Sequence, residues 1–173
     1  MPGSGKSTIV SALKTRGFEA LNLGDGVRAE AKRRNLEPSG DNLGKLMLEL
    51  REKNGPGAIA GLLTEPIKNS QSNVVIIDGV RSIAEIEVLK DVGTVKLLSI
   101  EAAADTRYKF LSSRGRSDDP ATREKFVERD NRELGVGIGE SIATADETIS
   151  NSNITLDELT ELAYKVIEKW IDT

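Results

Sequence analysis

The first eight residues of the chain, Met-Pro-Gly-Ser-Gly-Lys-Ser-Thr, contain most of a phosphate-binding P-loop. The full motif is Gly, any four residues, Gly, Lys, and then Ser or Thr. Gly5, Lys6 and Ser7 supply its second half, whereas its first Gly and the strand that leads into it would precede Met1. We therefore expect the gene to continue upstream in frame and to encode a short apolar strand followed by a Gly.

The residue types in this segment suit a nucleoside triphosphate. Gly3 and Gly5 let backbone N–H groups turn toward phosphate oxygens. Lys6 would place a cation on the β- and γ-phosphates, and the Ser7 hydroxyl would coordinate Mg²⁺. The alternative is a Gly/Ser-rich turn that only caps a helix. On the first interpretation, the residues that bind ATP are Gly3, Ser4, Gly5, Lys6, Ser7 and Thr8.

Composition argues against several classes of protein. A chain of 173 residues is expected to form a single domain that spans residues 1–173. Its net charge of −4 argues against a nucleic-acid partner, because nucleic-acid-binding surfaces are basic. The sequence has no Cys and no apolar run of about 18 residues, so we expect a cytoplasmic protein without a membrane partner.

The absence of His restricts the chemistry more strongly. Without His, the chain cannot build a Ser-His-Asp triad or a His-ligated zinc site. Catalysis would have to use carboxylates, Lys, Arg and a metal ion. Phosphoryl transfer can use these groups, because it depends mainly on positioning and on charge stabilisation.

Hydrophobic residues alternate between strand and helix spacing along the chain. We expect strands at residues 18–23, 74–77, 95–100 and 147–150. Helices are expected at 7–16, 25–35, 41–53, 58–69, 82–91, 105–113 and 122–134, followed by a short helix toward 145 and a last one from 155 onward. This order predicts an α/β fold, namely a three-layer α/β/α P-loop NTPase of the nucleoside or nucleotide kinase type with a parallel sheet.

The predicted parallel sheet would lack its first strand. In P-loop kinases that strand is central, so its absence would leave the neighbouring strands with unpaired backbone groups. We therefore expect either poor solubility or pairing of the open edge with another chain, and a homodimer is one such assembly.

The last helix carries a regular apolar stripe after a capping box. Thr155 and Glu158 have the spacing of a capping box, in which each side chain satisfies the backbone N–H of the other. The residues of the stripe follow helical spacing, which is typical of a core face rather than a cofactor site. They are Leu159, Leu162, Ala163, Val166, Ile167 and Trp170.

Two acidic residues follow predicted strands. Asp78 ends the apolar run at 74–77, as in a Walker B element whose Asp holds Mg²⁺. Asp25 follows the strand expected at 18–23, and strand ends on one side of a parallel sheet share the ligand crevice. Asp25 would orient or deprotonate an acceptor hydroxyl, and Arg28 would bind a phosphate of the acceptor. The alternative is that Asp25 caps a helix and Arg28 is solvated.

Four Arg residues lie in or after a polar loop. Arg114 and Arg116 belong to the loop, and Arg129 and Arg132 lie on one face of the following helix. Arg suits the phosphate charge that develops in a transition state. The alternative for the helical pair is that both are solvated charges paired with neighbouring Glu residues.

Three segments resemble P-loop nucleoside and nucleotide kinases. The run Asp78-Gly79-Val80-Arg81 resembles the Asp-Gly-Phe-Pro-Arg segment of adenylate kinases, with one Val in place of Phe-Pro. Residues 113–116 resemble a reduced LID. Residues 145–151 are similar to the Ala-Asp-x-x-Ile-x-Asn element of dephospho-CoA kinases, which borders the adenine of ATP in that family. The resemblance therefore implies that Asn151 binds the cofactor.

As a whole, the sequence resembles an archaeal family of dephospho-CoA-kinase-like and adenylate-kinase-like proteins. Members of that family carry Gly-Met-Pro-Gly-Ser-Gly-Lys, Asp-Gly-Val-Arg-Ser, Arg-Ser-Asp-Asp and Gly-Ile-Gly-Glu. The end of the first motif and all of the other three occur in this chain, and the match runs nearly from end to end.

The resemblance implies an ATP-dependent phosphotransferase that acts on a small nucleotide-like acceptor, with a helical acceptor-binding insertion at about 25–70 and a LID at about 113–121. The catalytic residues would be Lys6, Asp25, Arg81, Arg114 and Arg116. The acceptor would be bound by Asp25, Arg28, Arg81, Arg129 and Arg132, and Mg²⁺ by Ser7 and Asp78. The alternatives are a P-loop hydrolase or regulatory nucleotide-binding protein without a small acceptor, and an inactive nucleotide-binding module.

Overall fold

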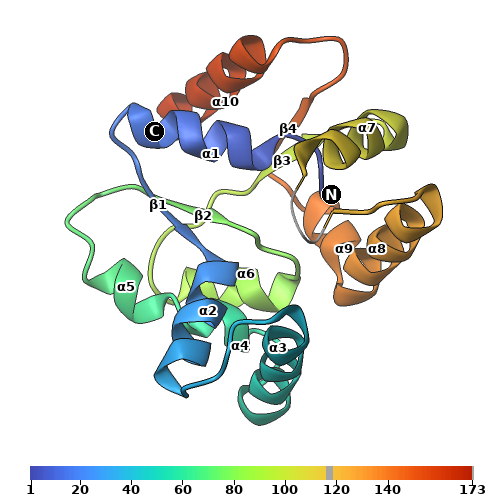
Figure 1. The fold of residues 1–173 in the computed structure, drawn as a ribbon. Coiled ribbons are helices and arrows are strands. Elements are labelled where there is room, and N and C mark those ends of the chain that lie inside the picture. Colours follow the sequence, from blue (N-terminus) through green and yellow to red (C-terminus); the bar gives the residue numbers. More distant parts are fainter. Residues whose placement is uncertain (116–118, 173) are drawn as a thin grey trace. The chain divides into compact units, whose positions relative to one another are not determined.

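The computed structural model describes residues 1–115 and 119–172, which fall into two compact units. Unit 1 comprises Met1–Gly17 and Lys96–Thr173, and unit 2 comprises Phe18–Val95 (Figure 1). The P-loop segment and the expected LID belong to unit 1, whereas the expected acceptor-binding helices belong to unit 2. Each unit is therefore described by itself.

Unit 1 is built around one pair of parallel strands. Its elements are α1 (Lys6–Thr15), β3 (Leu98–Glu101), α7 (Ala104–Arg114), α8 (Arg123–Val136), α9 (Ile138–Ala143), β4 (Glu147–Ser150) and α10 (Leu156–Ile171). Strands β3 and β4 pair with Leu98 opposite Glu147 and Glu101 opposite Ser150. Helices α1 and α10 lie side by side (Figure 1).

The last helix has most of the buried face that its sequence predicts. Leu159, Ala163 and Ile167 are buried, as expected from their spacing of four residues. Leu162, by contrast, is 44% exposed, and Thr160 is buried in its place. At 100° per residue, Leu162 lies beyond the edge of a face centred on Leu159, Ala163 and Ile167, so its assignment to the core was wrong.

The capping box at the start of α10 is confirmed. The Thr155 hydroxyl accepts a hydrogen bond from Glu158 N at 3.2 Å, and the Glu158 carboxylate accepts one from Thr155 N at 2.7 Å. These bonds satisfy two of the N–H groups that the first turn of a helix leaves without partners.

Unit 2 contains the second pair of parallel strands. Its elements are β1 (Glu19–Asn22), α2 (Leu23–Arg33), α3 (Gly40–Asn54), α4 (Ala58–Gly61), α5 (Thr64–Lys68), β2 (Val75–Asp78) and α6 (Ile83–Lys90). Strands β1 and β2 pair with Glu19 opposite Val75 and Asn22 opposite Asp78. This register brings the carboxyl ends of both strands together.

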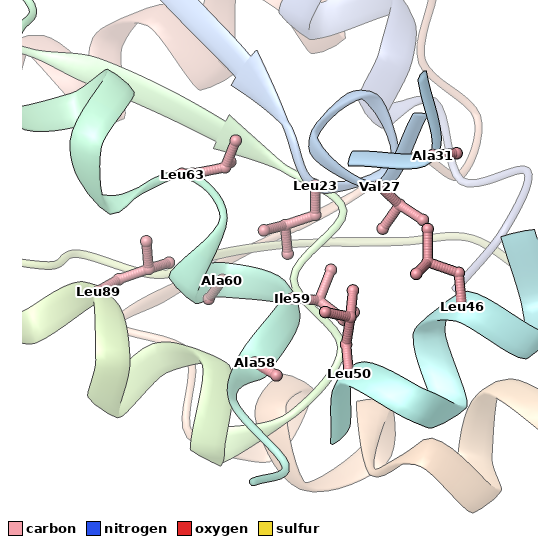
Figure 2. Close-up of a cluster of buried hydrophobic side chains, with 10 residues drawn as sticks. All are labelled: Leu23, Val27, Ala31, Leu46, Leu50, Ala58, Ile59, Ala60, Leu63 and Leu89. Carbon is pink, nitrogen blue, oxygen red and sulfur yellow. The ribbon is translucent and has the colours of Figure 1, made fainter. Parts of the chain in front are cut away.

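The core of unit 2 joins its helices and holds α2 in place. Figure 2 shows its buried side chains, which come from α2, α3, α4 and α6 and from Leu63 after α4. They are Leu23, Val27, Ala31, Leu46, Leu50, Ala58, Ile59, Ala60, Leu63 and Leu89. Because Leu23, Val27 and Ala31 follow helical spacing, the opposite face of α2 is exposed and carries most of its charged residues.

The single helix expected at 58–69 is divided into α4 and α5. Pro66 explains the division, because it has no backbone N–H to donate to the carbonyl of Leu62. The chain turns at Leu62 and Leu63, and Pro66 then lies in the first turns of α5, where a missing N–H costs little.

The predicted parallel strands are confirmed, although their boundaries shift. Within residues 1–115 and 119–172, the structure contains four strands, arranged as one two-stranded sheet in each unit. Strand β3 begins at Leu98 rather than at residue 95, because the amide of Leu97 donates to the Asp146 side chain at 2.7 Å. No helix in the described part of the chain is both long enough and apolar enough to cross a bilayer.

Candidate functional site

The P-loop segment turns sharply and leads directly into α1. Gly3 and Gly5 have φ angles of 81° and 103°, which an L-residue with a side chain rarely adopts. A Cβ on Gly3 would lie 2.8 Å from Arg107 O, and a Cβ on Gly5 would lie 2.9 Å from Asn151 Nδ2. Both positions therefore require Gly for conformation and for space.

The start of α1 suits an anion. Among the described residues, no side chain caps α1, as is also true of α4, α5, α7 and α9, whereas the other five helices each have a side-chain cap. Amide groups at such an N-terminus, together with the helix dipole, attract phosphate. Ser7 is exposed in the first turn, and Ser4 is 1% exposed within the loop.

Lys6 lies folded against the loop. Its Nζ donates to Met1 O at 2.8 Å and to Ser4 Oγ at 3.3 Å. The side chain is half-buried, so its ammonium group remains beside the loop. Binding a triphosphate at this position would exchange these two neutral acceptors for phosphate oxygens.

Two side chains donate to carbonyl groups of the loop. Arg107 Nη1 lies 3.2 Å from Pro2 O, and Asn151 Nδ2 lies 3.0 Å from Ser4 O. Asn151 was identified by its motif, but Arg107 was not. The sequence did contain a signal for Arg107. It lies four residues before Leu111, and this spacing places both residues on the buried face of α7.

The predicted adenine-bordering element surrounds β4. Asp146 accepts a hydrogen bond from Leu97 N at 2.7 Å and lies 3.3 Å from Lys96 Nζ, and these contacts lower the pKa of its carboxyl, the backbone bond most of all. Asn151 N donates to Glu101 O at 2.7 Å. The element is thus fixed at one end to the residues that precede β3 and at the other end to the last residue of β3.

The Arg residues near the expected LID lie in different environments. Arg114 Nη2 lies 2.5 Å from Asp119 Oδ1, and Arg129 Nη1 lies 3.8 Å from the same oxygen. Asp119 thus brings two of the predicted Arg residues together. Arg132 is exposed on α8, and Arg116 falls outside the described residues. The alternative of a solvated charge does not hold for Arg129, because its side chain is only 14% exposed.

In unit 2, Asn22 links the two strand ends. Its Nδ2 donates to Asp78 Oδ2 at 3.1 Å, and its Oδ1 accepts from Gly24 N at 2.8 Å and Asp25 N at 3.3 Å. Asn22 is therefore the N-cap of α2, and the interpretation of Asp25 as that cap was wrong. The sequence signal for this cap was an Asn at the end of a strand, three residues before an acidic residue of the following helix.

Asp25 and Arg28 lie one helical turn apart and bind each other. Arg28 Nη2 and Nε lie 2.5 Å and 3.1 Å from Asp25 Oδ1, and both side chains are more than half exposed. Arg28 also lines an open hollow of about 620 Å³ beyond the end of α2. The other residues of this hollow include Lys32, Asn35, Leu36, Glu37 and Pro38.

Glu85 fixes the turn that follows Asp78. Its carboxylate accepts a hydrogen bond from Arg81 N at 2.8 Å and lies 3.5 Å from Arg51 Nη2. Ser82 caps α6 through a 3.3 Å bond to Glu85 N, but the Glu85 side chain reaches the amide of Arg81. The spacing of Ser82 and Glu85 in the sequence is that of a capping box, of which the structure shows the Ser82 cap.

The carboxylates of the described residues would bind a metal ion only with a phosphate group as a further ligand. No cluster of three or more Asp, Glu, His or Cys side chains among the described residues could hold a metal ion by itself. Mg²⁺ is commonly bound by one or two carboxylates with waters and substrate phosphates completing its shell. Ser7 in unit 1 and Asp78 in unit 2 are groups of the types that such binding uses.

Comparison with known proteins identifies the family. The family model described as an AAA domain matches residues 1–126. The UPF0200 protein of Hyperthermus butylicus is 37% identical over 98% of this chain and 90% of its own length. The UPF0200 protein of Pyrococcus abyssi is 40% identical over 88% of this chain and 84% of its own length.

Two solved structures share the fold at low sequence identity. TT1252 from Thermus thermophilus has a TM-score of 0.69 at 19% identity, covering 96% of this chain and 93% of its own. Shikimate kinase from Bacteroides thetaiotaomicron has a TM-score of 0.65 at 15% identity, with the same coverage of both chains. The chain therefore belongs to the UPF0200 family of archaeal proteins, carries an AAA domain in its first 126 residues and has the α/β fold of P-loop kinases.

Proposed function

We propose that this protein is an ATP-dependent phosphotransferase that moves the γ-phosphoryl group of ATP-Mg²⁺ to a small nucleotide-like acceptor. The observation that carries the proposal is the P-loop segment, in which Gly3 and Gly5 adopt left-handed φ angles directly before the N-terminus of α1. This geometry is suited to a polyphosphate, because backbone amides and the helix dipole favour the same anion.

Unit 1 would bind the triphosphate. Lys6 would neutralise the β- and γ-phosphates, and residues 3–8 would supply backbone and hydroxyl donors. Mg²⁺, once bound, would neutralise phosphate charge, with Ser7 and Asp78 as the protein groups assigned to it. Arg114 would act on the transferred phosphoryl group, and Arg116 and Arg81 are assigned the same role.

Unit 2 would bind the acceptor. Arg28 would bind an acceptor phosphate and Asp25 would orient or deprotonate the acceptor hydroxyl, in exchange for the ion pair that they form here. The hollow beside Arg28 supports an anionic acceptor, because Lys32 lies one turn further along the same face of α2. Arg129 and Arg132 are also assigned to the acceptor.

The test is transfer of radiolabelled γ-phosphate from ATP-Mg²⁺ to dephospho-CoA, AMP, CMP and nucleosides, with separate measurement of phosphate release. We expect one acceptor class to become labelled, and we expect that acceptor to raise ATP turnover. Phosphate release that no acceptor changes would identify a hydrolase instead. Absence of both transfer and release, in a protein that binds ATP, would identify an inactive nucleotide-binding module.

A further inference from the structure

We infer that Arg107 and Asn151 are positioning residues that orient two peptide groups of the P-loop toward the triphosphate. The inference rests on the proposed function, because it concerns how the same loop binds phosphate. Arg107 belongs to none of the sequence motifs described above. Asn151 would act on the loop rather than on the adenine of ATP.

The orientation of each peptide group follows from the geometry of a trans peptide. The C=O of one residue and the N–H of the next belong to one plane and point in opposite directions. Arg107 holds the C=O of Pro2, so the N–H of Gly3 points to the opposite side of the loop. Asn151 holds the C=O of Ser4, so the N–H of Gly5 points away from Asn151 in the same manner.

The contacts of both glycines show which side of the loop is covered by protein. The space beside the Gly3 Cα is filled by Arg107 O and by Leu111 Cγ, which would lie 2.8 Å and 2.9 Å from a Cβ added there. The space beside the Gly5 Cα is filled by Asn151 Nδ2 and by Leu159 Cδ2, at 2.9 Å and 3.0 Å from such a Cβ. Arg107 and Asn151 thus fill these spaces and also hold the carbonyl oxygens.

Arg107 is itself held rigidly. Its guanidinium forms two hydrogen bonds to the Asp130 carboxylate, at 2.8 Å and 2.5 Å, and lies 4.9 Å from the centre of the Phe126 ring. The side chain is 8% exposed, and that of Asp130 is 16% exposed. A bidentate pair fixes the plane of the guanidinium, so the remaining donor direction toward Pro2 O is also fixed.

Asn151 is anchored through its backbone. Its N–H donates to Glu101 O at 2.7 Å, directly after the paired ends of β3 and β4. A short side chain that starts from a fixed backbone has few alternative positions. Its amide can therefore orient Ser4 without losing much conformational entropy when a ligand binds.

The experiment compares ligands with and without a base. Affinities for ATP-Mg²⁺ and for inorganic triphosphate-Mg²⁺ are measured by calorimetry for the wild type, Asn151→Asp and Arg107→Lys. Asn151→Asp has nearly the same shape but places an acceptor oxygen where Nδ2 donates to Ser4 O. Arg107→Lys retains the positive charge but loses the planar bidentate group.

We expect both variants to bind both ligands about tenfold or more weakly, by the same factor for each. Asp130→Asn should have a smaller effect in the same direction, because Arg107 keeps its bond to Pro2 O. The matched control is Arg16→Lys, since Arg16 also pairs with a carboxylate, Glu161 at 2.7 Å, and lies 4.2 Å from the Tyr164 ring. This control should bind both ligands as the wild type does.

The outcomes separate this inference from the proposed function. If Asn151→Asp weakens ATP but leaves inorganic triphosphate unchanged, Asn151 acts on the base and the inference is wrong for that residue. Unchanged affinities in folded Arg107→Lys and Asp130→Asn, as judged by thermal melting, would overturn it for Arg107. If the wild type binds neither ligand, the proposed function itself fails.

Discussion

Asn22 Nδ2 donates a 3.1 Å hydrogen bond to Asp78 Oδ2, and this bond joins the carboxyl ends of the two parallel strands of unit 2. The two residues lie opposite each other in the strand register. Because Asn22 Oδ1 also caps α2, one side chain fixes both the orientation of Asp78 and the start of the helix that carries Asp25 and Arg28.

We predict that Asn22→Asp destabilises unit 2 at neutral pH although Asp caps a helix as well as Asn. The substitution replaces the donor that faces Asp78 with a second carboxylate, and the cost should be about 1–2 kcal/mol. Two adjacent carboxylates take up a shared proton more readily than a lone carboxylate does, so the repulsion and the loss should shrink as the pH falls from 7 toward 4. Urea denaturation of the wild type and of Asn22→Asp between pH 7 and pH 4 measures this loss of stability.

Asn22→Ser is the control for this prediction. Ser retains the cap but is too short to reach Asp78, and it introduces no charge. It should lie close to the wild type, with a loss that does not depend on pH. Equal pH-independent losses in both variants would show that the contact between Asn22 and Asp78 contributes nothing specific.

Lys6→Ala should lower kcat/KM for phosphoryl transfer on the order of a hundredfold or more, because it removes the cation assigned to the transferring phosphate. The fold should be retained, since Lys6 is half-buried and its ammonium group donates to loop atoms, Met1 O and Ser4 Oγ, rather than to the core. Lys14→Ala, an exposed position on the same helix, is the matched control. Unchanged turnover of Lys6→Ala at saturating ATP-Mg²⁺ would exclude the kinase assignment.

Arg28→Ala should raise KM for the acceptor far more than KM for ATP. Loss of a charge-assisted phosphate contact costs about 1.5–3 kcal/mol, or about tenfold to a hundredfold in affinity. Steady-state kinetics with each substrate varied in turn measures the two values. Arg33→Ala is the control, because Arg33 lies on the same helix but pairs with Glu30 at 2.7 Å. Equal changes in both KM values would place the acceptor elsewhere.

Asp25→Asn should lower kcat more than either KM, because a carboxylate that orients or accepts the hydroxyl proton acts mainly in the transition state. The structure sharpens this test, since Asn22 rather than Asp25 caps α2. An effect on kcat therefore cannot arise from loss of the cap. If the variant has wild-type kcat, Asp25 serves only as the partner of Arg28.

We predict that the Glu30 carboxylate makes the stability of the folded protein depend on pH. Hydrogen bonds from Arg33, the largest cause, and from Arg34 lower the pKa of Glu30 to about 2. A carboxyl whose pKa is lower in the folded state than in the unfolded state stabilises the protein at pH values above its unfolded-state pKa. This contribution is lost as the pH falls from about 5 toward 2. Glu30→Gln should thus cost about 1 kcal/mol at pH 7 and progressively less in acid. Urea midpoints between pH 7 and pH 3 measure this.

Glu65→Gln is the matched control for Glu30. Its carboxylate pairs only with Lys68 among the contacts described, at 3.3 Å, and both side chains are more than half exposed. An exposed single pair contributes little. The difference between this variant and the wild type should therefore stay small at every pH, and a constant difference for Glu30→Gln would contradict the predicted role of its carboxylate.

Much of the fold follows from local sequence patterns. The P-loop, the capping box at Thr155 and the strand at residues 147–150 were predicted because each depends on neighbouring residues. Helix boundaries were less accurate where a side chain competed with the backbone. Asn22 starts α2 two residues before the predicted position, and Pro66 divides a segment whose apolar spacing predicts one helix.

The sequence by itself determined the family and the P-loop pattern, because the residues of that pattern are contiguous and the similarity to relatives runs along the chain. Only the tertiary structure showed what supports the P-loop residues. Arg107 and Pro2 are 105 positions apart, and Asn151 and Ser4 are 147 apart. Such contacts depend on how helices and strands pack, and no local spacing of residue types encodes them. The groups that would bind phosphate thus lie within eight consecutive residues, whereas their orientation depends on the folded chain.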